Sequence, residues 1–165
     1  MSKAISSKSI LFVCLGNICR SPAAEGVMQH LINQRSLSEQ IRVDSAGTAG
    51  YHIGKLADAR MRAAAERRGL NLTSRSRLVL PSDLRDFDLV VPMDRSNYRD
   101  LMGLVPGAKH DNVKMLSDFL DSSWPREVPD PYYGGEEGFE YVLDMLQAAC
   151  PAILNEIVGS QEPSA

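Results

Sequence analysis

Near the start of the chain, a short apolar run leads at once into a turn and the beginning of a helix. The run is Ile10-Leu11-Phe12-Val13, and the residues after it read Cys14-Leu15-Gly16-Asn17-Ile18-Cys19-Arg20-Ser21-Pro22. Consecutive apolar residues predict a strand buried on both faces, as in a parallel sheet. Serine followed by proline favours a helix start, with Ser21 as the cap and Pro22 in the first turn. The pattern therefore predicts a strand–loop–helix unit, and α/β sheets bind ligands at such loops.

The loop in this unit has the composition of a cradle for a dianion. Its backbone N–H groups, from Leu15 to Arg20, can converge on phosphate oxygens, and the following helix adds the positive end of its dipole. Gly16 lets the backbone approach closely. The planar guanidinium of Arg20 can hold two phosphate oxygens at once. Cys14 is expected at the base of the loop, where the amides, the helix dipole and Arg20 create a positive potential. A positive potential favours the thiolate form of the cysteine, which is the nucleophilic form.

Two polar residues of the loop are expected to shape it. Asn17 tolerates a left-handed backbone, and its amide can hold the loop. Ser21 can donate a hydrogen bond to the Cys14 sulfur. The cradle and its nucleophile would then be fixed by one set of side chains.

Composition limits the class of protein. The 165 residues suffice for one domain, predicted over residues 8–158 between flexible termini at 1–7 and 159–165. A net charge of −3 gives no reason to expect nucleic-acid binding. No apolar run approaches the roughly 20 residues of a membrane span. Three cysteines are an odd count, and the loop needs a free thiol, so we expect a cytoplasmic protein.

Strand and helix patterns alternate along the chain, which predicts an α/β fold with a parallel sheet. Strands are expected at residues 10–13, 41–45, 87–93 and 113–116, and helices at 22–34, 58–68, 94–102 and 136–158. Pro151 should kink or divide the last helix. The arginines Arg60, Arg62, Arg67, Arg68, Arg75 and Arg77 indicate a solvated face or, alternatively, a surface for acidic partners.

A cysteine that attacks phosphorus needs a proton donor for the leaving oxygen. The best candidate is Asp130, in the segment Asp130-Pro131-Tyr132-Tyr133-Gly134-Gly135. Pro131 restricts Asp130 to an extended backbone, from which its carboxyl group could swing over a bound substrate. An Asp before Pro also fits an ordinary turn, and the local pattern does not separate the two interpretations.

The chain closely resembles the low-molecular-weight protein tyrosine phosphatases. The matching motifs occur in family order and spacing over about residues 8–158. They are Val13 to Pro22, Asp44-Ser45-Ala46-Gly47-Thr48, Met93-Asp94 with Ser96-Asn97, and Asp130-Pro131-Tyr132-Tyr133. The resemblance implies three layers around a central parallel four-stranded sheet.

The resemblance also implies a function and a set of roles. Cys14 would be the nucleophile, Arg20 the phosphate clamp and Asp130 the general acid, later the base. The phosphate-binding residues would be Leu15, Gly16, Asn17, Ile18, Cys19, Arg20 and Ser21. Asn17, Ser21 and Ser45 would form the network that shapes the loop, Tyr51 and Tyr133 would wall the substrate slot, and Cys19 would be a redox partner of Cys14.

On the same resemblance, phosphotyrosine proteins or small aryl phosphates are the expected substrates of a protein that needs no metal or other cofactor. A monomer is expected, with a weak dimer as the alternative. Ser74 departs from the family pattern, since members usually carry there a histidine that braces the loop network.

Two other functions stay open. An arsenate reductase could use the same cradle, but its chemistry needs further thiols in a relay, and Cys150 is expected in the core. A non-catalytic phosphotyrosine-binding module would need neither Cys14 nor Asp130. The three histidines, His30, His52 and His110, are scattered and are expected to be surface or core residues with no part in catalysis.

Overall fold

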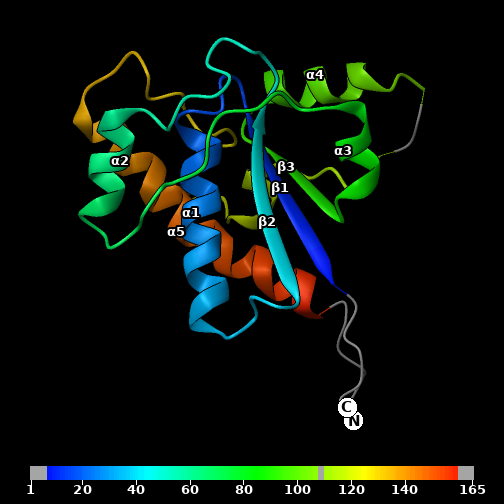
Figure 1. Ribbon diagram of the computed structural model, residues 1–165, viewed down its shortest axis with the longest axis horizontal. Coiled ribbons are helices and arrows are strands. Elements are labelled where there is room, and N and C mark those ends of the chain that lie inside the picture. Colours follow the sequence, from blue (N-terminus) through cyan, green and yellow to red (C-terminus); the bar gives the residue numbers. More distant parts are fainter. Residues whose placement is uncertain (1–6, 108–109, 160–165) are drawn as a thin grey trace.

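A parallel sheet with the strand order β2-β1-β3 lies between two layers of helices (Figure 1). The computed structural model describes residues 7–107 and 110–159. The elements in chain order are β1 (Lys8–Cys14), α1 (Arg20–Gln34), β2 (Ile41–Gly47), α2 (Ala59–Glu66), α3 (Pro81–Asp86), β3 (Leu89–Pro92), α4 (Arg95–Leu104), the 3-10 helix η1 (Leu116–Phe119) and α5 (Glu136–Gly159). The termini that we expect to be flexible lie outside the described residues, apart from Ser7 and Gly159, and Gly159 ends α5.

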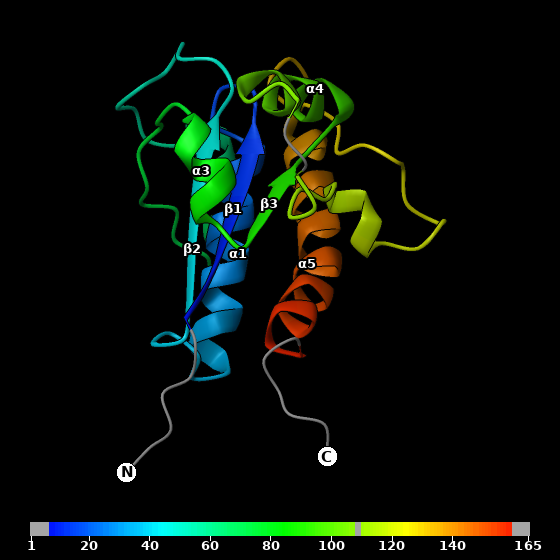
Figure 2. The same ribbon diagram turned by 90° about the vertical axis from the view of Figure 1, so that its right-hand side faces the viewer.

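The central strand β1 is buried on both faces, as its continuous apolar sequence predicts. Ile10 and Phe12 pack into the core formed with α1 and α5, whereas Leu11 and Val13 pack into the core formed with α3 and α4. Figure 2 shows the helices on the two sides of the sheet. The alternation of β1 side chains between two cores accounts for the three layers.

The prediction of a fourth strand at residues 113–116 is wrong, since the sheet of the described residues has three strands. Val113 makes one isolated bridge to Val90, whose N–H donates to the Asn112 carbonyl while its own carbonyl accepts from Lys114. The chain then turns into η1, because the Asp118 carboxylate accepts the N–H of Met115 at 3.0 Å. A local turn therefore ends the pairing after one residue.

Helix α1 begins two residues before the expected start. Arg20 is its first residue and Cys19 its N-cap, without a side-chain capping bond, so the prediction that Ser21 caps the helix is wrong. Pro22 still lies in the first turn, where no N–H is needed. The early start leaves the Ser21 hydroxyl free to bond elsewhere.

Helix α5 runs without a break through Pro151, so the proline does not divide it. Cys150 and Ile153, on either side of the proline, are fully buried and hold both halves of the helix in the core. By length and composition alone α5 could cross a membrane. Half of its most apolar stretch is buried inside the protein, as in the core helix of a globular fold.

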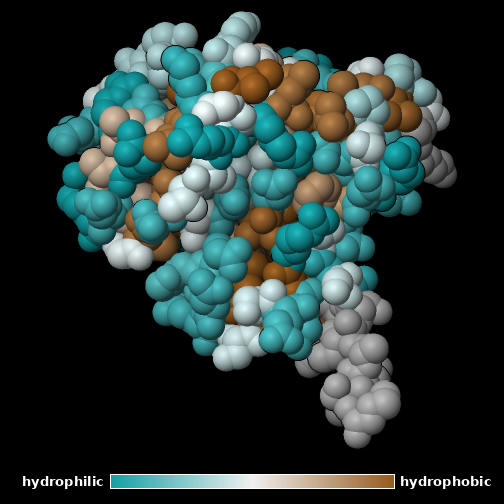
Figure 3. All heavy atoms as spheres, viewed as in Figure 1, coloured by the Kyte–Doolittle hydropathy of each residue, from teal (hydrophilic) through white to brown (hydrophobic). Residues whose placement is uncertain are grey.

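The strands of the sheet point toward one edge of the molecule, and apolar surface gathers along that edge (Figures 1 and 3). Several of the large exposed apolar side chains belong to segments that follow strand ends, among them Leu15, Tyr51, Ile53 and Leu56. Parallel α/β sheets bind ligands at this edge. The loop after β1 lies there.

Candidate active site

The loop between β1 and α1 turns its carbonyl groups away from its own centre. The carbonyls of Cys14 and Leu15 accept from Thr48 and Ala49, which follow β2. Two further carbonyls are bonded to other segments: that of Gly16 by the Ser76 hydroxyl at 3.0 Å, and that of Ile18 by the Asp58 N–H at 2.8 Å. Within the described chain, the N–H groups of residues 15–19 donate to no protein acceptor. The amides are therefore left for an anion.

Asn17 is the centre of a network of buried side chains. Its φ of 57° is left-handed, as expected from its residue type. Its Nδ2 donates to the hydroxyls of Ser21 and Ser45 at 2.8 and 3.0 Å, and its Oδ1 accepts from the Arg77 N–H at 2.9 Å. The Ser21 Oγ lies 3.0 Å from Cys14 Sγ. Ser21 accepts from Asn17, and the other acceptor within reach of its hydroxyl, the Ala46 carbonyl, lies at 3.5 Å, so its proton can be donated to the sulfur instead.

Arg20 is held by groups far away in the sequence. Its side chain is 3% exposed, and its Nη1 donates to Asp94 Oδ2 at 2.7 Å and to the Val128 carbonyl at 3.0 Å. Burial alone lowers the pKa of Arg20, but the neighbouring Cys14, Asp94 and Asp130 outweigh burial and raise it. The guanidinium is therefore a fixed positive charge beside the loop. The sequence places Asp94 at the start of the helix expected over residues 94–102, and its other oxygen does cap α4.

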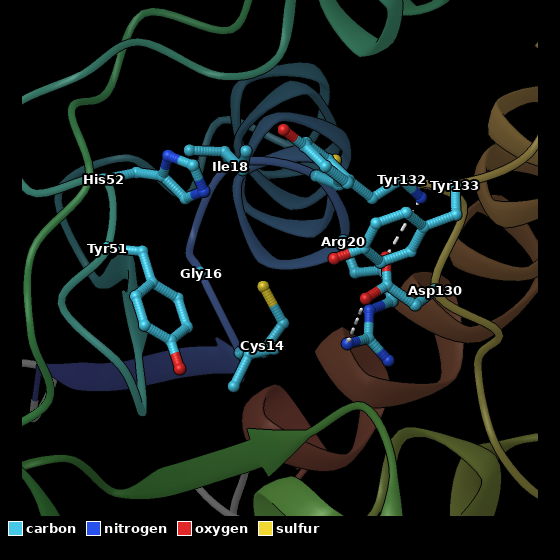
Figure 4. A pocket seen from close by; sticks show the side chains of 11 residues that line it. Cys14, Gly16, Ile18, Arg20, Tyr51, His52, Asp130, Tyr132 and Tyr133 are labelled. Atoms are coloured by element: carbon cyan, nitrogen blue, oxygen red, sulfur yellow. Dashed lines mark hydrogen bonds and ion pairs between the residues drawn. The ribbon is translucent and has the colours of Figure 1, made fainter.

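Cys14, Arg20 and Asp130 line one pocket, together with Leu15, Gly16, Ile18, Cys19, Tyr51, His52, Tyr132 and Tyr133. Asp130 Oδ2 lies 3.8 Å from Arg20 Nη2, and its Oδ1 accepts the N–H of Tyr132 at 3.0 Å (Figure 4). Asn17, Ser21 and Ser45 lie outside the lining and are joined to it by the hydrogen bonds above. The structure thus brings the expected site residues to one place.

Aromatic side chains wall the mouth of this pocket. Tyr51 and His52 stand on one side of Cys14, and Tyr132 and Tyr133 stand on the other (Figure 4). The rings of His52 and Tyr132 lie 6.3 Å apart between centroids. His52 was expected to be a surface or core residue, so its place in the pocket wall is a correction. The sequence did offer one indication of this position, because His52 directly follows Tyr51, which was expected to wall the substrate slot.

Glu25 is joined to the hydrogen-bond network of Asn17 through Ser45. Its Oε1 accepts from the Ser45 hydroxyl at 2.6 Å, and Ser74 is also hydrogen-bonded to this carboxyl group. The residue at the position of the family histidine therefore contacts Glu25, while Asn17 is held by the backbone of Arg77. Burial raises the pKa of Glu25, and the hydrogen bonds from the two serines counteract it only in part.

Glu25→Gln should change how the stability of the protein depends on pH. Because the pKa of Glu25 is raised above the usual 4.5, the folded state binds its proton more tightly than the unfolded state. The contribution of Glu25 to stability is therefore fully present below pH 4.5 and is lost as the pH rises through its raised pKa in the folded state. In thermal unfolding at about pH 4 and pH 7, the melting temperature of the variant relative to that of the wild type should be higher at pH 7 than at pH 4. An identical difference at both values would contradict the shift.

The other two cysteines differ from Cys14 in their surroundings. Burial, followed by the charge of Asp58 and by Cys14, raises the pKa of Cys19, and burial alone raises that of Cys150. Both thiols are therefore held in the protonated form. In the described part of the chain, no group of three or more His, Cys, Asp or Glu side chains is arranged to hold a metal ion.

Comparison with known proteins identifies this arrangement. The family model described as low molecular weight phosphotyrosine protein phosphatase matches residues 9–162. A relative from Synechocystis sp., provisionally named a low molecular weight protein-tyrosine-phosphatase, is 48% identical over 90% of this chain and 95% of its own. The human low molecular weight phosphotyrosine protein phosphatase is 40% identical over 92% of this chain and 96% of its own.

Solved structures agree with these relatives. A protein tyrosine phosphatase from Entamoeba histolytica, with Hepes in its active site, superposes with a TM-score of 0.89 at 44% identity. That match covers 94% of this chain and all of the other.

Proposed function

Since the chain belongs to the low molecular weight phosphotyrosine protein phosphatase family, it is a hydrolase of phosphotyrosine that works through a phosphocysteine intermediate, and we propose that Cys14, Arg20 and Asp130 perform the reaction. One observation carries the assignment of roles. These three side chains line a single pocket above a loop whose amides are free to bind an anion.

In the first step, the Cys14 thiolate attacks phosphorus in line with the departing tyrosine oxygen. Asp130 donates its proton to that oxygen as the phosphorus–oxygen bond breaks and the sulfur–phosphorus bond forms. The Ser21 hydroxyl, 3.0 Å from the sulfur, stabilises the thiolate before the attack.

In the second step, Asp130 accepts a proton from water, which attacks phosphorus and releases phosphate and the Cys14 thiolate. Arg20 and the loop amides of residues 15–20 hold the charge on the equatorial oxygens in both steps. Asp94 and the Val128 carbonyl keep Arg20 in place, so these two groups act as positioning groups.

The pocket walls favour a flat ring next to the phosphoryl group. Tyr51 is 75% exposed and Tyr133 is 91% exposed, so both rings can stack on a substrate ring at little cost in reorganisation. We propose phosphotyrosine proteins and small aryl phosphates as substrates.

The cysteines argue against arsenate reduction. Cys150 is fully buried in α5 and does not line the pocket. A thiol relay would need it at the surface near Cys14. Cys19 does line the pocket, and we propose that it condenses with the sulfenic form of Cys14, after oxidation by a peroxide, to give a disulfide and water.

The remaining proposals rest on composition. A net charge of −3 and free cysteines support a monomeric cytoplasmic protein that binds neither nucleic acid nor a membrane.

A panel of kcat/KM values over phosphotyrosine, phosphoserine, phosphoarginine and arsenate tests the proposed function. Phosphotyrosine should be preferred by a wide margin, because only it offers an aromatic ring to the tyrosine walls. Reduction of arsenate with thioredoxin, or a preference for phosphoserine, would contradict the proposal.

A further inference from the structure

The segment that carries Asp130 is tied down at two points. At one end, the Val128 N–H donates to the Met93 carbonyl at 3.0 Å, and the Val128 carbonyl accepts from Arg20. At the other end, the carbonyl of Tyr132 accepts from Arg60 Nη2 at 3.0 Å. Between them Asp130 is exposed, and its carboxylate has no other anchor from the described residues than Arg20 and the Tyr132 N–H. Because the Tyr132 N–H is the closer of these two anchors, the position of the carboxylate depends in part on how Tyr132 is held.

Arg60, the second residue of α2, contacts the ring of Tyr132 in addition to donating the hydrogen bond to its carbonyl. Its guanidinium carbon lies 5.3 Å from the centre of the Tyr132 ring and 4.8 Å from that of Phe139, at the start of α5. The same side chain makes a two-pronged pair with Asp58, in which Nε and Nη2 each donate at 3.0 Å. A planar, forked group is needed for all of these contacts, and lysine could make only part of them.

Asp58 connects this arrangement to the phosphate loop. Its N–H donates to the Ile18 carbonyl at 2.8 Å, while its carboxylate caps α2 and accepts from Arg60. Arg60 in turn holds the pKa of Asp58 below its usual value, so the pair stays charged. The contacts form one path from the cradle through Asp58, Arg60 and Tyr132 to Asp130.

We propose that Arg60 is a positioning residue that sets the general acid Asp130 over the leaving oxygen, through the carbonyl and ring of Tyr132. This inference rests on the proposed role of Asp130. It assigns Arg60 a task that its place in an arginine-rich, solvated helix does not indicate. Arg67, just after α2, provides a comparison: it pairs with the half-buried Glu140 at 2.7 Å and, among the described residues, makes no hydrogen bond or ion pair with the Asp130 segment.

Arg60→Met tests the proposal, since methionine keeps the aliphatic stem and loses the fork. Displacing a general acid lowers kcat/KM most when the leaving group is poor, because a poor leaving group depends most on receiving a proton. We therefore expect kcat/KM for phenyl phosphate to fall about 10- to 100-fold, and that for 4-nitrophenyl phosphate to fall far less. Arg60→Lys should recover part of the loss. The Arg67→Met control should match the wild type.

Two further measurements separate the proposal from its alternatives. Competitive inhibition by inorganic phosphate should be unchanged in Arg60→Met, because the cradle is intact. In an Asp130→Asn background, Arg60→Met should cause almost no further loss with phenyl phosphate, since positioning has no effect once the acid is absent.

Each contrary outcome has a distinct meaning. Equal losses with both substrates, additive effects in the double variant, or weaker phosphate inhibition would overturn the role of Arg60 while leaving that of Asp130 intact. If Asp130→Asn alone showed no dependence on the leaving group, the general acid itself would be misassigned.

Discussion

Cys14→Ser is expected to abolish turnover while inorganic phosphate still binds. The serine hydroxyl is not ionised near neutral pH, and the side chain hydrogen-bonded to this position among the described residues, Ser21, offers a hydroxyl and not a base. The loss should be on the order of 10⁶-fold in kcat, the scale found when a covalent nucleophile is removed. The cradle amides and Arg20 do not depend on the sulfur, so the affinity for phosphate should persist.

Steady-state assays and calorimetric titration with inorganic phosphate measure the two halves of this result. Cys150→Ala is the matched control, because it also removes one thiol but lies in the core away from the pocket. Turnover retained in Cys14→Ser, or failure to trap phosphate on the Cys14 sulfur of the wild type after rapid quenching, would rule out the nucleophile assignment.

Asp130→Asn should have the second largest effect, and its size should depend on the substrate. A general acid or base contributes roughly 10²- to 10⁴-fold. The tyrosine oxygen is a poor leaving group, because the unperturbed pKa of a phenol is about 10. We therefore expect kcat/KM to fall within that range for phosphotyrosine and by much less for 4-nitrophenyl phosphate.

The pH profile provides an independent reading of the same residue. The reaction needs a thiolate and a protonated carboxyl group in the same form of the enzyme, so kcat/KM of the wild type should depend on pH. The shape of that dependence should change in Asp130→Asn and stay as in the wild type in Asp100→Asn, a control on the exposed face of α4. An identical profile in the wild type and Asp130→Asn would show that Asp130 is not the acid.

The parts of the fold and site that could be predicted are those determined by short stretches of sequence. The buried strand β1, the left-handed Asn17 and the proximity of Ser21 to Cys14 all follow from residues within one loop and its flanks. Hydrophobic pattern and residue type decide such features locally.

The parts that could not be predicted depend on contacts between distant segments. The sequence pattern places Asp94 at the start of a helix, and nothing near it indicates that one of its oxygens binds Arg20, 74 positions away. His52 enters the pocket wall only because the segment after β2 folds over the loop. The strand expected at residues 113–116 failed because the Asp118 turn competes with the sheet, and pattern alone does not weigh the two.

The outward-facing carbonyls of the loop after β1 have a consequence for the end of the catalytic cycle. The carbonyls of Cys14 and Leu15 are bonded to Thr48 and Ala49, that of Gly16 to Ser76 and that of Ile18 to Asp58, so three other segments hold the cradle in its shape before an anion binds. A site preorganised in this way binds an anion with little loss of conformational entropy. Orthophosphate, the product, has the same oxygens as the group that is transferred. The protein should therefore be subject to product inhibition, and its rate at a given substrate concentration should fall as the concentration of free phosphate rises.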